Sequence, residues 1–375
     1  MTVTSVLPVV SELPPDAPPD QHAEVVGLVY VADDEPGISR VRRGKGWSFH
    51  GPDGTVIPDG PERERCLRLA IPPAWTDVWI CRDPDGHLQA TGYDEAGRKQ
   101  YRYHDLWREV RDATKFHRMR AFREVLPSIR EAVDRDLRRR SLSREKVLAL
   151  VVALLDETLI RVGNDEYART NESYGLTTLL REHVDVDGTT VRFAFPAKSG
   201  QEREYAFRDR RLARQVAKCA DISGPRLFAY LDADERWHAV DSGAVNAYLR
   251  EVSGDDFTAK DFRTWGGTSV VARSLRELGP PQSAADAEKN ILAAIDAAAE
   301  QLGNTRAVCR ASYVDPRVPK AYRFDRFDEA WDDDDGTVDR LSPAERAVGR
   351  ILEMDLPRSS DLESLLAASV DVEDE

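Results

Sequence analysis

The chain has 375 residues, a length typical of two or three domains and sufficient for a hydrophobic core without disulfides. Hydrophobic residues make up 41% and charged residues 32%, which indicates a globular protein, and no apolar stretch approaches the roughly 20 residues of a membrane span. The first basic residue is Arg40, which argues against a signal peptide, so we expect a cytoplasmic protein.

The net charge of −14 conceals a basic middle between two acidic ends. Residues 1–37 hold seven acidic residues and neither Lys nor Arg, and residues 325–375 hold seventeen acidic residues and five Arg. The remaining residues, 38–324, therefore carry a net charge of +5, and Arg98–Lys146 alone has sixteen basic and eight acidic residues. This distribution favours a nucleic-acid partner, with Arg98–Lys146 lining its channel, although the whole-chain pI is near 5.1.

The first hundred residues predict a small β domain after a disordered start. Residues 1–24 contain two Pro-Pro pairs and few aromatic residues, which is typical of disorder. Over residues 25–104, the short apolar runs VVGLVYVA, GWSF and TDVWIC alternate with turn sequences such as Pro-Asp-Gly. We expect these runs to form a small antiparallel sheet or partial barrel.

From residue 105 the apolar spacing becomes that of helices. Helices are predicted over 105–125 and 127–140, separated by a break at Pro127, and then over 143–162, 209–220, 242–252, 258–278, 283–302 and 307–313. Alternating apolar residues over 190–207 predict an inserted β-hairpin with Lys198 at or beside its turn. The fold class is therefore α+β, with a β domain at 25–104 and a mainly helical domain at 105–324.

The acidic segment 325–375 is predicted to be a solvated tail. Its apolar residues near 351–366 could form one amphipathic helix. The alternatives are a tail that binds an unidentified partner, or one that mimics DNA and regulates the chain's own basic surface.

The sequence lacks the motifs of nucleotide-driven and metal-driven chemistry. It has no P-loop, no G-x-G-x-x-G after a strand, no H-E-x-x-H and no G-x-S-x-G. Its four cysteines form no C-x-x-C pair, and we interpret them as small buried hydrophobic residues. We therefore expect neither a cofactor nor a metal ion.

The remaining candidates for functional side chains are a few basic residues and one tyrosine. Arg161 closes a predicted helix, Lys198 lies at the hairpin turn, Arg263 lies early in a helix and Tyr313 ends the last one. Taken singly, each has an ordinary structural explanation, such as complementing a helix dipole or packing. The strand Gly97–His104 interleaves basic and aromatic side chains, which suits contacts with phosphates and bases, or else protects a sheet edge.

In their order and local context these residues resemble the type IB DNA topoisomerases, specifically the compact poxvirus-like and bacterial forms. The resemblance covers about residues 25–323. It rests on GRKQYRYH at 97–104, RVGN at 161–164, the hairpin lysine followed by Ser-Gly, KDFRTW at 260–265 and RASY at 310–313.

The resemblance implies an enzyme that relaxes supercoiled duplex DNA by transient single-strand cleavage, strand rotation and religation, without ATP or metal. Tyr313 would be the nucleophile that forms a 3′-phosphotyrosyl bond, and Arg161 and Arg263 would bind the non-bridging oxygens. Lys198 would protonate the leaving 5′-oxygen. Asn304 stands nine residues before Tyr313, where the family often has histidine, and would donate a neutral hydrogen bond.

The resemblance also implies how DNA is held. Gln100, Tyr101 and Tyr103 resemble DNA contacts of the small domain, and Tyr167 resembles a contact of the catalytic domain. We expect a monomer whose two domains form a clamp around double-stranded DNA, associated with the nucleoid.

Two other interpretations stay open at this point. A tyrosine recombinase shares the Arg-Lys-Arg-Tyr set but usually has H-x-x-R at the second arginine, where this chain has Lys260 three residues before Arg263. A non-catalytic DNA-binding clamp would use the basic surface without needing Tyr313. A protein-interaction scaffold would rest on the acidic ends alone.

Overall fold

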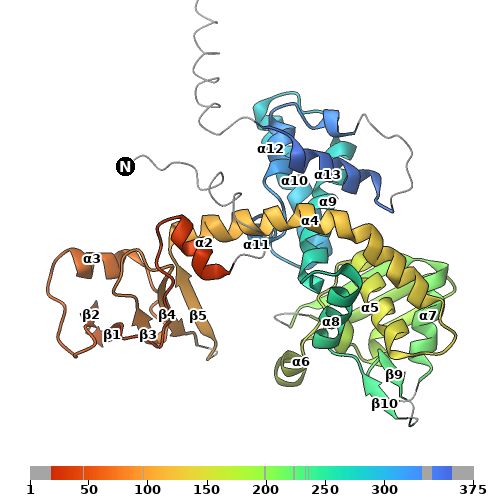
Figure 1. Ribbon diagram of the computed structural model, residues 1–375, viewed down its shortest axis with the longest axis horizontal. Coiled ribbons are helices and arrows are strands. Elements are labelled where there is room, and N and C mark those ends of the chain that lie inside the picture. Colours follow the sequence, from red (N-terminus) through yellow and green to blue (C-terminus); the bar gives the residue numbers. More distant parts are fainter. Residues whose placement is uncertain are drawn as a thin grey trace, which may run out of the picture. The chain divides into compact units, whose positions relative to one another are not determined.

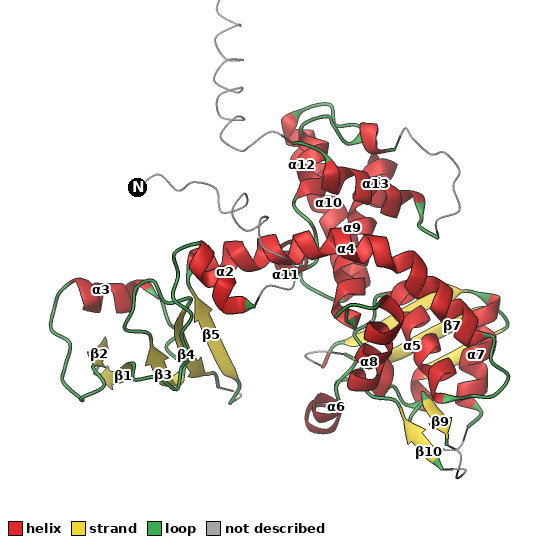
Figure 2. Cartoon of the chain, in the orientation of Figure 1, coloured by secondary structure: helices red, strands yellow, loops and turns green. Residues whose placement is uncertain are grey.

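The computed structural model describes residues 18–331 and 340–356, apart from 45, 96, 198–199, 223, 233 and 235 and the side chains of 109 and 111–117. The chain divides into two compact units, Met1–Arg118 and Met119–Glu375. Figures 1 and 2 show a sheet with short helices in the first unit and a mainly helical body in the second. The predicted α+β class is confirmed.

The first unit is built on an antiparallel five-stranded sheet in the order β2-β1-β3-β4-β5. Alternate residues of its strands, including Ile38, Phe49 and Ile80, form one buried cluster. The elements are α2 (Pro19–Val25), β1 (Ile38–Arg43), β2 (Gly46–His50), α3 (Pro61–Arg68), β3 (Thr76–Ile80), β4 (Leu88–Tyr93) and β5 (Lys99–Tyr103).

The start of this unit differs from the sequence prediction. The helix α2 lies partly where disorder was expected, and its Ala23 is buried. The apolar run that follows forms no strand, because Val29 makes only an isolated bridge to Gly86. Ala23 and Leu28 pack in a cluster with Trp107 of the helix α4 (Asp105–Leu137). This contact explains why the first unit extends past residue 104. Residues 1–17 lie outside the described chain.

The predicted break at Pro127 is wrong. A single helix, α4 (Asp105–Leu137), includes this proline. Proline removes one backbone hydrogen bond, but Phe122, Leu126 and Ile129 around it are all buried. Their packing maintains the helix across the proline, since tertiary contacts supply most of the stability of a helix in a protein.

The second unit surrounds the buried helix α5. Ser143 caps this helix by accepting from the amide of Lys146, and Val147–Leu155 is almost wholly buried. Its elements after α4 are α5 (Arg144–Thr158), α6 (Asp165–Asn171), β6 (Val184–Asp187), β7 (Thr190–Pro196), β8 (Glu202–Arg208), α7 (Arg210–Ala220), β9 (Ala229–Leu231), β10 (Trp237–Ala239), α8 (Ser242–Ser253), α9 (Ala259–Leu278), α10 (Ala284–Leu302), α11 (Arg306–Ser312), α12 (Arg317–Arg323) and α13 (Pro343–Glu353). The strands β7 and β8 form the predicted hairpin, and β6 extends it.

Part of the segment predicted as a tail is folded. The helix α13 buries Ala347, Val348 and Ile351, and it packs against α9 and α12 (Figure 1). The described part of the segment after 324 therefore packs on the second unit and contributes residues to its core. Residues 332–339 and 357–375 lie outside the described chain.

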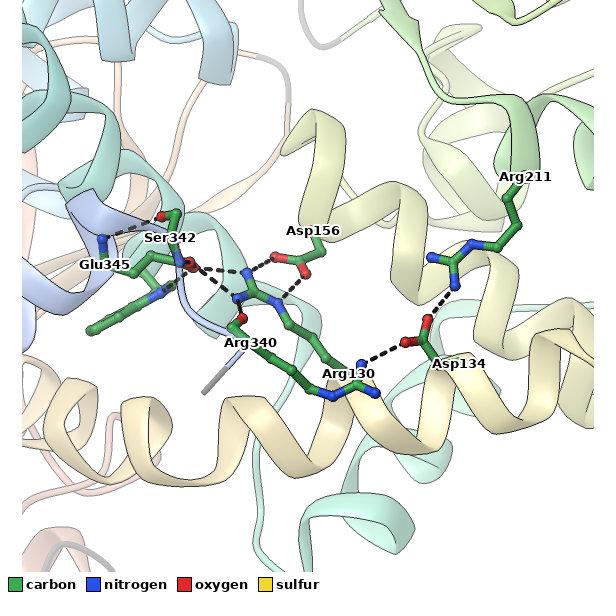
Figure 3. Close-up of polar contacts among 8 residues, drawn as sticks. Arg130, Asp134, Asp156, Arg211, Arg340, Ser342 and Glu345 are labelled. Atoms are coloured by element: carbon green, nitrogen blue, oxygen red, sulfur yellow. Dashed lines mark hydrogen bonds and ion pairs between the residues drawn. The ribbon is translucent and has the colours of Figure 1, made fainter. Parts of the chain in front are cut away.

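A partly buried ionic network attaches α13 to the rest of this unit (Figure 3). The Glu345 carboxylate accepts from Arg130 of α4 at 2.7 Å and from the Trp265 indole of α9 at 2.8 Å. Arg130 also donates to Asp156 of α5 at 2.7 Å. Burial would raise the pKa of Glu345, but Arg130 and the Ser342 amide outweigh burial and lower it. Glu345 thus links α13 to α9, the helix that carries Arg263.

We expect Glu345→Ala to reduce the free energy of unfolding by about 2 kcal/mol, because it leaves the buried Trp265 N–H without an acceptor and Arg130 with Asp156 as its one carboxylate partner among the described residues. The matched control is Glu353→Ala, which removes an ion pair whose carboxylate is 63% exposed and should cost less than about 1 kcal/mol. Urea denaturation measures both, and equal losses would contradict the assigned role of the network.

Candidate active site

The helix α5 ends four residues earlier than predicted, and this places Arg161 in an extended segment. Leu159 adopts a left-handed conformation (φ 56°) that ends the helix. The Thr158 hydroxyl donates to the Leu154 carbonyl at 2.6 Å. Beyond the turn, the Arg161 carbonyl accepts from the Leu176 amide at 2.9 Å. Arg161 therefore does not cap a helix, and its backbone is held by a neighbouring loop.

The side chain of Arg161 contacts the loop that joins α10 to α11. Its Nη2 donates to the Gly303 carbonyl at 3.2 Å and to Oδ1 of Asn304. Gly303 ends α10 with φ 61°, a conformation that favours glycine. The Asn304 Nδ2 atom is buried and has no hydrogen-bond partner among the described residues. Buried donors in proteins are normally hydrogen-bonded, so the unpaired Nδ2 beside the Arg161 guanidinium can donate to a bound acceptor.

Arg263 is buried, with 4% of its surface exposed, and it donates to backbone carbonyls. Nη1 donates to the Leu159 carbonyl and Nη2 to the Leu302 carbonyl at 2.9 Å. Its Nε has no partner in the described chain, and desolvation lowers the pKa of the guanidinium. Neither Arg263 nor Arg161 has a carboxylate partner among the described residues. Buried positive charge without an anion is costly, and a bound anion would offset this cost.

Tyr313 lies directly beside Arg263. The guanidinium carbon is 5.0 Å from the centroid of the tyrosine ring. Close approach to α9 sets this position, because a Cβ atom on Gly267 would lie 2.8 Å from the Tyr313 carbonyl oxygen. The Thr268 hydroxyl donates to the same carbonyl at 3.2 Å. The helix α9 thus supplies Arg263 and also holds the backbone of Tyr313.

The charges around Tyr313 favour its phenolate. Burial alone would raise the pKa of the phenol, but Arg263, Arg161 and Lys260 together lower it. A more acidic phenol is a better source of a nucleophilic oxygen near neutral pH.

Lys198 lies outside the described residues, but the hairpin that carries it is described. The Ala197 amide donates to the Gln201 carbonyl at 2.8 Å and closes the base of the turn. The hairpin lies close to the site, because a Cβ atom on Gly303 would be 3.2 Å from the Tyr205 hydroxyl of β8. The structure therefore brings together Arg161, Arg263, Asn304 and Tyr313 and places the base of the Lys198 hairpin beside them.

The predicted DNA contacts occupy two other surfaces. On β5, Tyr101 and Tyr103 share an exposed face and stack with ring centroids 6.0 Å apart. Gln100 points to the opposite face and donates to Asp94 at 2.9 Å. Tyr167 lies on α6 of the second unit and is 49% exposed. Tyr101, Tyr103 and Tyr167 thus expose their side chains to solvent, and Gln100 has an intramolecular acceptor.

Comparison with known proteins identifies the family. Residues 104–322 match the family model for the catalytic core of eukaryotic DNA topoisomerase I, and residues 46–94 match that for the N-terminal domain of bacterial DNA topoisomerase IB. The chain belongs to the type IB DNA topoisomerases. The family predicted from the sequence motifs is confirmed, and the chain is an enzyme that acts on DNA.

Two viral relatives illustrate the similarity. The chain is 33% identical over 285 residues to the DNA topoisomerase 1B of Acanthamoeba polyphaga mimivirus. The aligned region covers 74% of this chain and 85% of the relative. It is 24% identical over 268 residues to the DNA topoisomerase 1B of vaccinia virus strain Copenhagen, covering 69% and 81%.

Sequence reasoning overlooked several residues at the site of this type IB topoisomerase. Gly267 and Thr268 hold the Tyr313 backbone, and Lys260 adds a third positive charge near its phenol. The spacing of Lys260 and Arg263, three residues apart on a helix, was a usable signal, since such residues share a face. Nothing in the sequence alone indicated the close approach at Gly267.

The described residues suggest no metal centre or membrane span. They contain no cluster of three or more His, Cys, Asp or Glu side chains able to hold a metal ion. None of the described helices is long and apolar enough to cross a membrane.

We expect Lys260→Met to raise the pKa of Tyr313, since it removes one of the charges that lower it. The pH dependence of DNA cleavage should then shift to higher pH. The control is Lys289→Met, an exposed lysine on α10 that does not influence Tyr313. Rates of covalent-complex formation between pH 6 and 10 measure the effect, and superimposable profiles for all three proteins would refute it.

Proposed function

We propose that this type IB topoisomerase relaxes supercoiled duplex DNA through a covalent bond between Tyr313 and a backbone phosphate. The observation that carries the proposal is the pairing of Tyr313 with Arg161 and Arg263, two guanidiniums that have no carboxylate partner in the described chain. Arginine remains charged and offers a planar fork that matches phosphate oxygens, so this arrangement suits a phosphodiester.

The proposed reaction is an exchange of phosphodiester bonds. The phenol of Tyr313 loses its proton to water, its oxygen bonds to the phosphorus, and the bond from phosphorus to the 5′-oxygen breaks. The leaving oxygen takes a proton from Lys198, whose role is inferred from the family resemblance. A positioned acid of this kind contributes roughly 10²- to 10⁴-fold to a rate.

Negative charge grows on the non-bridging oxygens as the phosphorus gains its fifth substituent. Arg161, Arg263 and the free donor of Asn304 are the groups we propose to stabilise that charge. The phosphotyrosyl ester retains the energy of the broken bond, so religation by the 5′-hydroxyl requires neither ATP nor a metal ion in this scheme.

We further propose that both units contact DNA. Tyr101 and Tyr103 would pack on the duplex from the first unit and Tyr167 from the second, while basic residues bind phosphates. A clamp formed by one monomer stays a prediction, as does activity at the nucleoid in the cytoplasm. Phosphate contacts make the affinity for DNA fall steeply with salt.

We expect the wild type to relax supercoiled plasmid in EDTA without ATP, and Tyr313→Phe to lose relaxation entirely while still binding DNA. The variant removes the attacking oxygen and little else. Gel electrophoresis of the plasmid, with SDS trapping of the covalent complex, measures both steps. Relaxation by both proteins would reject Tyr313 as the nucleophile, and relaxation by neither, with binding intact, would favour a recombinase or a non-catalytic clamp.

The acidic end can be tested by two truncations. Residues 357–375 hold six acidic residues and one Arg, so we propose that they compete with DNA or bind a partner. Deleting 357–375 should tighten DNA binding at matched salt. Deleting 325–375 also removes α13 and should instead lower thermal stability. Unchanged affinity after the shorter deletion would refute the autoregulatory role.

A further inference from the structure

One strand beside the site carries two polar side chains that the scheme above does not use. Arg203 and Tyr205 lie on the half-buried face of β8, whereas Arg208 lies on its exposed face. A Cβ atom on Gly303 would be 3.4 Å from Arg203 Nε and 3.2 Å from the Tyr205 hydroxyl oxygen. Gly303 also supplies the carbonyl that accepts from Arg161. Arg203 and Tyr205 therefore form part of the wall of the site.

The position of Arg203 is set by its strand. In the β7–β8 pairing Arg203 lies opposite Phe195, one position from the end of the ladder. Tyr205, two residues along, stacks on Phe195 with ring centroids 5.9 Å apart. Tyr205 is also among the groups that raise the pKa of the Arg263 guanidinium against its desolvation. The face of β8 that carries Arg203 is thus directed toward the residues around Tyr313.

The guanidinium of Arg203 has no anionic partner in the described chain. It donates to the Gln201 amide oxygen at 2.8 Å, which is a neutral acceptor. Arg161 contacts the same glycine and likewise has no carboxylate partner among the described residues. Two guanidiniums that approach one backbone residue repel each other, and an anion bound to both relieves that repulsion.

Asn304 contacts Arg161 in the same wall of the site but carries no charge. Its side chain can donate a hydrogen bond through its buried Nδ2. We propose that Arg203 is a further phosphate-binding residue, which supplies from β8 the positive charge that Asn304 lacks. This inference rests on the proposed function, since the phosphate it assigns to Arg203 is the one that Tyr313 attacks.

The test compares Arg203→Gln with Arg208→Gln in the full chain. Both variants remove one charge from the same strand, but only Arg203 faces the site. We expect Arg203→Gln to slow plasmid relaxation and SDS-trapped complex formation by about tenfold or more, since loss of one transition-state donor commonly costs about 10²-fold or more. Arg208→Gln should remain within about twofold of the wild type, and the thermal midpoints of all three should agree.

A second variant separates charge at the phosphate from a structural role. Asn304→His placed in the Arg203→Gln background can carry a positive charge below the usual histidine pKa of about 6.5. Rescue of relaxation at pH 6 that disappears at pH 8.5 would support the proposal. Rescue that is absent or independent of pH, or a wild-type rate for Arg203→Gln, would overturn it. Either failure leaves the dependence on Tyr313 intact, whereas relaxation by Tyr313→Phe would reject the proposed function itself.

Discussion

The guanidinium of Arg263 joins three parts of the second unit at one point. It donates to the carbonyl of Leu159, where α5 ends, and to that of Leu302, where α10 ends, and its carbon lies 5.0 Å from the ring of Tyr313. Carbonyl oxygens pair with its Nη1 and Nη2 groups but cannot neutralise its charge, and its Nε has no partner among the described residues. The site therefore retains buried positive charge, which in the proposed function binds the phosphate that Tyr313 attacks.

This arrangement requires a rigid α9. On one side the helix meets Leu159 and the Tyr313 carbonyl across Gly266 and Gly267, where any Cβ would collide. Trp265, buried in the same helix, donates to Glu345 of α13. The helix α13 is thus part of the scaffold that supports the site, which explains why apolar residues recur in a segment that is otherwise acidic.

Several differences between sequence pattern and structure have one cause, which is tertiary packing that outweighs a local signal. Proline normally ends a helix, yet α4 continues through Pro127 because buried residues surround it. Glycine normally ends a helix, yet α5 ends at Thr158, before the left-handed Leu159 whose carbonyl accepts from Arg263. Near Pro127, Phe122 packs on Phe257, Phe262 and Trp265, so contacts with residues distant in the sequence accompany both differences.

The sequence by itself determined the family, the α+β class, the β7–β8 hairpin and the candidates Arg161, Arg263, Asn304 and Tyr313. These conclusions depend on residue types, periodicity and motif order, all of which are local. The tertiary structure decided which groups lie beside Tyr313 and how its phenol becomes more acidic. It also revealed Thr268, Gly267 and Arg203 at the site. Their contacts join segments that are distant in the sequence, such as Gly303 and Arg203, which are 100 residues apart, and such contacts produce no periodic pattern in the sequence.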